Sequence, residues 1–138
     1  MSLFLEEESG RLRDPIMAYC LSKKGALEDY PFGPLPVVMK VGGKMFALLT
    51  MVDQKVSHIS LKCDPVIAAN LREQHEAVQP GYHLNKKHWN TVTIDGSLSE
   101  ADLQDMIDHS YDLVLKTLPK AKRLAITQRL VSSDGEDT

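Results

Sequence analysis

Cysteines, aromatic residues and long apolar runs are all scarce in this sequence of 138 residues. The only two cysteines, Cys20 and Cys63, are far apart and in no metal or redox spacing, so we expect two buried free thiols. No apolar run approaches the ~20 residues that a membrane-spanning helix needs. The N-terminus lacks the basic start and apolar centre of a signal peptide. We therefore expect a cytoplasmic protein without a membrane contact.

Catalytic motifs are missing as well. The sequence contains no glycine-rich phosphate loop, no Cys-x-x-Cys and no Gly-x-Ser-x-Gly. Serine, histidine and aspartate are present, but no signature groups them. We expect a binding protein rather than an enzyme, with no metal and no cofactor.

Acidic residues gather at the two ends of the chain. Six carboxylates lie there, namely Glu6, Glu7, Glu8, Asp134, Glu136 and Asp137, and leaving them out changes the net charge from −3 to +3. The part between them is mildly basic, which permits a weak anion-binding face but falls far short of a strongly basic nucleic-acid binder.

The composition, 43% hydrophobic and 25% charged, is that of one globular domain. We expect a flexible segment over residues 1–13, the domain over residues 14–120, and a basic and then acidic tail over residues 121–138. The sequence indicates no oligomeric state.

Start and stop signals predict the elements of the domain. Asp14-Pro15, Asp64-Pro65 and Ser99 are helix starts, and Gly25 and Pro119 are stops. Gly42-Gly43 predicts a tight hairpin. The expected strands are residues 37–41, 44–49, 56–62, 76–79 and 90–94. The order α-β-β-β-α-β-β-α predicts an α+β two-layer sandwich, in which helices cover one face of a mostly antiparallel five-stranded sheet.

One stretch, residues 80–92, stands apart from ordinary core and caps. Pro80-Gly81 opens it, and it holds the only tryptophan, two of the five histidines, two adjacent lysines and no carboxylate. A stable fold alone does not require polar, basic and aromatic groups to be gathered at the edge of a strand. This stretch is therefore the first candidate for a functional site.

Several motifs together resemble the MmcQ/YjbR family over about residues 14–120. They are Tyr30-Pro-Phe-Gly33, Lys-x-Phe-Ala at 44–47, Leu-Lys-Cys-Asp-Pro at 61–65, Pro-Gly-Tyr-His-Leu-Asn-Lys-Lys-His-Trp-Asn at 80–90, and Ser-Tyr-Asp-Leu-Val at 110–114 followed by Leu-Pro-Lys at 118–120. The resemblance implies a two-layer α/β fold related in shape to type III secretion chaperones and to the frataxin CyaY. Members are described as candidate DNA-binding proteins, and the resemblance implies no enzymatic activity.

Lysines beside an aromatic ring favour nucleic-acid binding, because lysines displace the counterions of the phosphates and a ring can stack on a base. If Val92 and Ile94 face the helices, then Trp89 faces the other side of the sheet. The candidate nucleic-acid-binding residues are Lys40, Lys62, Tyr82, His83, Asn85, Lys86, Lys87, His88 and Trp89. In the alternative reading, Trp89 caps the core edge, Tyr82 and Asn85 fix a turn, and the lysines are merely solvated.

Two metal readings are weaker. His83 and His88 have no cysteine or carboxylate beside them in the same stretch, whereas metal sites need three or four converging ligands. The acidic row on the last helix, Asp102, Asp105, Asp108 and Asp112, is ordinary for the polar face of an amphipathic helix. We expect weak, sequence-independent DNA binding through the 80–92 stretch and the open sheet face. The alternative is a protein-interaction or self-association module that uses the same face.

Overall fold

The structure is a computed structural model that describes residues 14–137, with side chains described through residue 128. The flexible segment expected over residues 1–13 and the acidic side chains at the C-terminal end lie outside these residues. The elements are α2 (Pro15–Leu21), β1 (Ala26–Asp29), β2 (Val37–Val41), β3 (Lys44–Val52), β4 (Lys55–Lys62), α3 (Pro65–Gln74), β5 (Val78–Pro80), β6 (Trp89–Thr93), α4 (Glu100–Thr117) and α5 (Lys120–Asp137).

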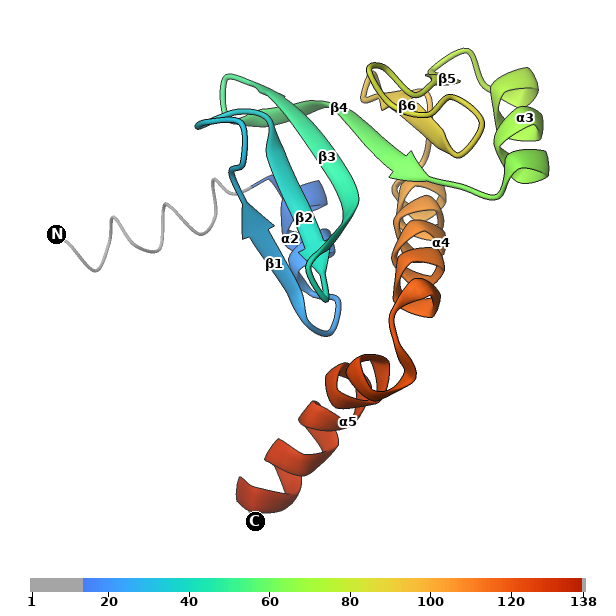
Figure 1. Cartoon of the computed structure of the whole chain (residues 1–138). Helices are drawn as coiled ribbons and strands as arrows, with labels where there is room; N and C mark the ends of the chain where they lie inside the picture. Colours follow the sequence, from blue (N-terminus) through green and yellow to red (C-terminus); the bar gives the residue numbers. More distant parts are fainter. Residues whose placement is uncertain (1–13, 138) are drawn as a thin grey trace, which may run out of the picture.

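The strands form one antiparallel sheet in the order β1-β2-β3-β4-β6-β5 (Figure 1). Helices α2 and α4 pack on one face of this sheet, where their apolar side chains meet those of the strands. Met17 of α2, Ile107 of α4 and Ile59 of β4 belong to the same buried cluster. The two-layer α+β class predicted from the sequence is confirmed. We call the opposite side of the sheet the open face.

All three expected helix caps are present. Asp14 accepts a hydrogen bond from the Ile16 amide at 2.7 Å, and its other oxygen accepts one from the Val56 amide at 2.9 Å, which ties α2 to β4. Asp64 caps α3, and Ser99 caps α4 by accepting from the Asp102 amide. Each cap satisfies an amide that has no partner within its own helix.

The predicted Gly42-Gly43 hairpin also forms. Gly42 and Gly43 have φ of 59° and 84°, the left-handed region that a tight β-hairpin turn requires. Gly42 also lies against α4, because a Cβ at this position would be 2.5 Å from Cδ1 of Leu118. The hairpin therefore needs glycine for its backbone angles and for its packing.

Two elements differ from the prediction. The sheet has six strands rather than five, because residues 26–29 pair with β2. Ala-Leu-Glu-Asp has weak strand propensity, so the sequence carries little signal for β1. The tail after Pro119 is helix α5, and its Ile126 packs against the core cluster. This contact lies close to Gly25, where a Cβ would be 2.9 Å from Cγ2 of Ile126.

A buried serine joins α4 to the middle of the sheet. Ser110 is fully buried, and its hydroxyl donates to the Phe46 carbonyl oxygen at 2.6 Å while accepting from the Lys62 amide at 2.9 Å. One side chain thus satisfies backbone groups of both β3 and β4. Phe46 also packs edge-on against the ring of Tyr111, with ring centroids 5.4 Å apart.

Candidate functional site

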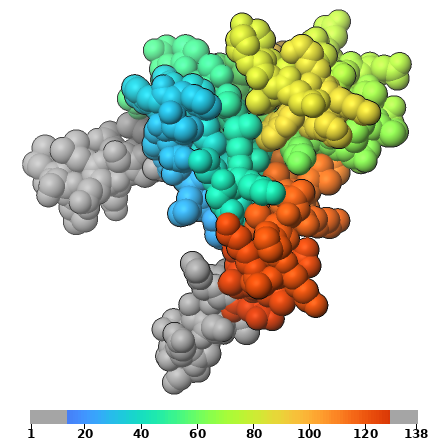
Figure 2. Space-filling model, in the orientation of Figure 1, coloured from blue at the N-terminus to red at the C-terminus, as the bar shows by residue number. Residues whose placement is uncertain are grey.

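The 80–92 stretch becomes the end of β5, a loop of residues 81–88, and β6. We call residues 81–88 the β5–β6 loop. In the space-filling view these residues, coloured yellow, lie on the outer surface beside α3 (Figure 2). Tyr82 is 71% exposed, and Leu84 and His88 are half-buried. The loop is therefore an accessible surface rather than a core element.

Backbone hydrogen bonds close the loop at its base. The Gly81 amide donates to the Trp89 carbonyl oxygen at 2.8 Å, and the Cys63 amide donates to the His88 carbonyl oxygen at 2.8 Å. Gly81 lies so close to Trp89 that a Cβ at Gly81 would be 2.7 Å from the Trp89 Cβ. The Pro-Gly predicted as a turn therefore has a second role, since only glycine fits against the tryptophan.

Arg72 of α3 supports the loop from behind. Its Nε donates to Asn90 Oδ1 at 2.7 Å, and its Nη2 donates to the Lys86 carbonyl oxygen at 2.5 Å. Asn90 is buried, and its Nδ2 donates to the Ala68 carbonyl oxygen at 3.4 Å. Sequence reasoning missed Arg72, because nothing in the α3 sequence marks this arginine as a partner of residues 14 to 18 positions later.

The loop presents an aromatic and basic surface. Tyr82 and His83 are both exposed, and their ring centroids are 4.0 Å apart at a tilt of 53°. Asn85 Oδ1 accepts from the Lys87 amide at 2.9 Å, which fixes the turn as the alternative reading expected. The Lys87 side chain is exposed, and no partner for it appears among the described residues.

The other candidate residues of the stretch are more constrained. Lys86 is exposed but its Nζ donates to the Gly81 carbonyl oxygen at 3.0 Å. Trp89 is half-buried, so it has both a packed side and an accessible side. It pairs across the sheet with Lys62, which brings that lysine next to the loop.

Next to the loop, the open face carries a pair of hydroxyl groups, of which Ser60 is buried and Thr91 is half-buried. Ser60 of β4 and Thr91 of β6 are cross-strand partners, and their hydroxyl oxygens lie 2.7 Å apart. The Thr91 hydroxyl also accepts from the Tyr82 amide at 3.0 Å, which fixes the start of the loop beside this face.

Lys40 is the candidate that the structure does not bring to the loop. It lies on β2, separated from β6 by β3 and β4. Its Nζ forms an ion pair with Asp29 at 2.6 Å, and this hydrogen bond lowers the pKa of the Asp29 carboxyl. Lys40 is therefore already neutralised by β1, on a distant part of the sheet.

The acidic row on α4 divides into separate environments. Asp108 accepts from the Tyr19 hydroxyl at 2.7 Å and pairs with Lys23, which ties α4 to α2. Asp102 and Asp105 instead lie at the rim of a cavity. Among the side chains described, no three histidine, cysteine or carboxylate groups come together in a way that could hold a metal ion.

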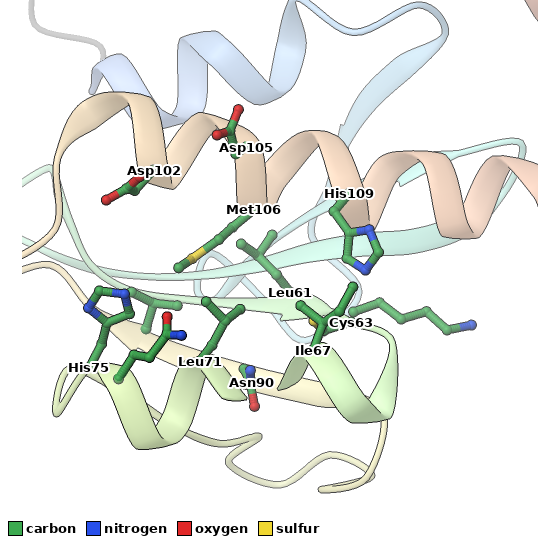
Figure 3. Close-up of a pocket in the computed structure, with 13 residues that line it drawn as sticks. Leu61, Cys63, Ile67, Leu71, His75, Asn90, Asp102, Asp105, Met106 and His109 are labelled. Carbon is green, nitrogen blue, oxygen red and sulfur yellow. The ribbon is translucent and has the colours of Figure 1, made fainter. Parts of the chain in front are cut away.

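The cavity lies between α3 and α4 and has a volume of about 280 Å³ (Figure 3). Leu61, Ile67, Leu71, Val92 and Met106 give it apolar walls. The remaining lining residues are Lys62, Cys63, Gln74, His75, Asn90, Asp102, Asp105 and His109. Sequence reasoning missed this cavity, because its residues come from four elements that only the fold brings together.

Comparison with known proteins gives the family. A family model described as YjbR matches residues 21–113, about two thirds of the chain. The chain belongs to the YjbR family. It is 36% identical over 113 residues to the uncharacterized protein YjbR of Escherichia coli K12, covering 82% of this chain and 95% of that relative. It is 42% identical over 91 residues to the uncharacterized protein YbdF of Escherichia coli O157:H7, covering 66% of this chain and 74% of YbdF.

Solved structures of similar proteins share the fold. A Deinococcus radiodurans protein with a DUF419 domain has a TM-score of 0.74 at 37% identity, covering 81% of this chain and 85% of that one. A Pseudomonas syringae protein has a TM-score of 0.61 at 28% identity, covering 70% of this chain and 93% of that one. The YjbR match includes the β5–β6 loop and ends before α5. The family expected from the sequence motifs is confirmed.

Proposed function

We propose that this YjbR-family chain binds nucleic acid weakly and without sequence preference, through the β5–β6 loop and the adjoining open face. One observation carries the proposal. Lys87, Tyr82 and His83 are exposed together on a loop whose backbone is held by hydrogen bonds at its base. A loop that is already ordered loses less conformational entropy on binding than a mobile one.

The chemistry of this surface supports a polyanion as the ligand. No carboxylate occurs between residues 77 and 94, so the loop lysines meet no opposing charge in their own segment. Lys87 is available to contact phosphates, Lys62 lies beside the loop, and Lys86 can contact a phosphate through the donors that its hydrogen bond to Gly81 leaves over. The Tyr82–His83 pair offers rings to a base. Stacking on an aromatic ring contributes about 1–3 kcal/mol per base and tolerates any sequence.

The proposal assigns binding, and no chemistry, to the chain. Burial raises the pKa of Cys20 to about 12 and that of Cys63 to about 11, so neither thiol is a nucleophilic thiolate near neutral pH. Within residues 14–137 no helix is long and apolar enough to cross a membrane.

A salt titration tests the proposal. About three phosphate contacts predict a slope of log K against log salt near −2.7, which is a loss of about 40-fold in affinity for duplex DNA between about 50 and 200 mM salt. Fluorescence anisotropy with a labelled duplex measures this. We expect dissociation constants in the micromolar range or weaker. An affinity that does not change with salt would contradict the proposal.

A second candidate is self-association or a protein partner at the far end of the open face. It is favoured by Leu27, which is 69% exposed on the edge strand β1. Met45 and Leu48 of β3 are only half-buried. Sedimentation velocity tests this candidate. If the chain forms a dimer and the Leu27→Lys variant is a monomer, self-association through this part of the open face is favoured.

A further inference from the structure

The cavity between α3 and α4 is open to solvent and has unfilled apolar walls. Figure 3 shows Met106 reaching from α4 toward Leu61 and Leu71, with Ile67 on the α3 side. Ile67 is 43% exposed, and Leu71 and Met106 are half-buried. These side chains surround a space of about 280 Å³, close to the lower end of the ~300–1,000 Å³ usual for small-molecule sites. A ligand that fills it gains the burial of this apolar surface.

The charge at the cavity rim is mainly negative. Asp102 and Asp105 both line the cavity from α4. Figure 3 shows Asp102 at the end of the cavity that His75 also borders, whereas the Asp105 carboxylate points away from Leu61 and Leu71. Neither forms an ion pair with any other side chain that the structure describes. By contrast, Asp108 on the same helix is paired with Lys23. The rim therefore carries two carboxylates whose charge the described part of the protein leaves unbalanced.

The remaining polar groups of the cavity add no competing anion and little positive charge. Cys63 is a neutral thiol near neutral pH, because burial raises its pKa to about 11. Lys62 is the only lysine or arginine in the cavity lining. His75, at the end of α3, stands on the opposite wall from Asp102 (Figure 3).

We propose that this cavity binds a small organic cation with an apolar body, placing the amine at Asp102, with the charge of Asp105 nearby, and the hydrocarbon part against Leu61, Ile67, Leu71 and Met106. The carboxylates supply charge complementarity, and the apolar walls supply the burial. This site is on the helix side of the sheet and shares only Lys62 with the proposed nucleic-acid surface. The cation proposal does not rest on that lysine, so it is independent of the proposed function.

Amide NMR titration with three probes of similar size tests the site. The probes are phenethylamine, phenethyl alcohol and phenylpropionate, which differ mainly in charge. We expect phenethylamine to bind about fivefold more tightly than the alcohol, since an ion pair near the surface contributes up to about 1 kcal/mol. Shifts should appear at residues 61–63, 67–71 and 102–109. Equal binding of the alcohol, or shifts elsewhere only, would overturn the proposal.

Variants make the test specific to the cavity. The double variant Asp102→Asn and Asp105→Asn should remove the preference for the amine but keep the binding of the alcohol. Asp112→Asn, on an exposed part of α4 outside the cavity, is the matched control and should keep the preference. Ile67→Trp should fill the cavity from an exposed position and weaken all three probes. Unchanged binding in Ile67→Trp, or a preference that survives the double variant, would overturn the proposal.

Discussion

Ser110 shows how one side chain can hold a sheet to a helix. Its hydroxyl is the only hydrogen-bonding group of α4 that reaches both β3 and β4 in the described structure, because it donates to Phe46 and accepts from Lys62. The sequence marks Ser110 only as a small polar residue on the apolar side of the helix. Its role depends on two strands that are 64 and 48 positions away, so helical periodicity alone does not reveal it.

Ser110→Ala should lower the free energy of unfolding by about 1–3 kcal/mol, because it leaves a buried carbonyl oxygen and a buried amide without a partner. Urea unfolding followed by circular dichroism measures the loss. Ser97→Ala is the control, because it removes only an exposed hydrogen bond to the Asp95 carboxylate, and it should cost less than about 0.5 kcal/mol. Equal losses in the two variants would show that the Ser110 bridge contributes nothing to stability.

Trp89 is the residue that reports on the proposed interface. Since it is half-buried and is the only tryptophan, its fluorescence comes from one site beside Lys62. We expect emission that is red-shifted from that of a buried indole, quenched by iodide and altered by added DNA. The urea-unfolded chain gives the limit of full exposure. Blue emission that iodide does not quench would remove Trp89 from the interface.

At the scale of elements, cap residues and turns were the strongest sequence signals. Asp14, Asp64 and Ser99 act locally, so their neighbours in sequence suffice to place α2, α3 and α4. The sequence signal for β1 was weak because Glu28 and Asp29 have low strand propensity. These residues form a strand because they pair with β2. Helix α5 was missed since its sequence is mostly polar and its described anchor, Ile126, is a single residue.

The hairpin between β2 and β3 offers a test of packing at this scale. Gly42→Ala should lower the free energy of unfolding by about 2–4 kcal/mol, because alanine is strained in the left-handed conformation and its Cβ would clash with Leu118. Gly96→Ala is the matched control. Gly96 has φ of 84° and no atom within 4 Å of its Cβ position, so only strain of about 1 kcal/mol remains. Equal melting temperatures for the two variants would show that the contact with Leu118 contributes little.

At the scale of the whole molecule, the open face and the helix side carry different surfaces. The fold class and the loop that carries Lys86 and Lys87 were predictable, because both follow from local patterns. The cavity was not predictable. His75 lies at the end of α3, and Asp102 and His109 lie on α4, and only the folded sheet brings these two helices close together. Lys40 was a candidate because it was expected on the open face, and strand alternation gives the face of a sheet but not the distance from the loop.

The central claim is that nucleic acid binds at the β5–β6 loop rather than at any basic part of the protein. The double variant Lys86→Glu and Lys87→Glu tests it against Lys120→Glu and Lys122→Glu on α5. Both pairs are exposed and both variants change the net charge equally, so a general effect of charge is the same in each. Circular dichroism of both variants shows whether the fold is retained.

Fluorescence anisotropy with the same duplex at low salt then decides the claim. We expect the loop variant to lose detectable binding and the α5 variant to stay within about threefold of the unmodified chain, because the α5 lysines are not among the proposed phosphate contacts and act only through long-range charge, which salt weakens. Unchanged affinity in the loop variant, with binding lost in the α5 variant, would contradict the assignment of the interface to the β5–β6 loop.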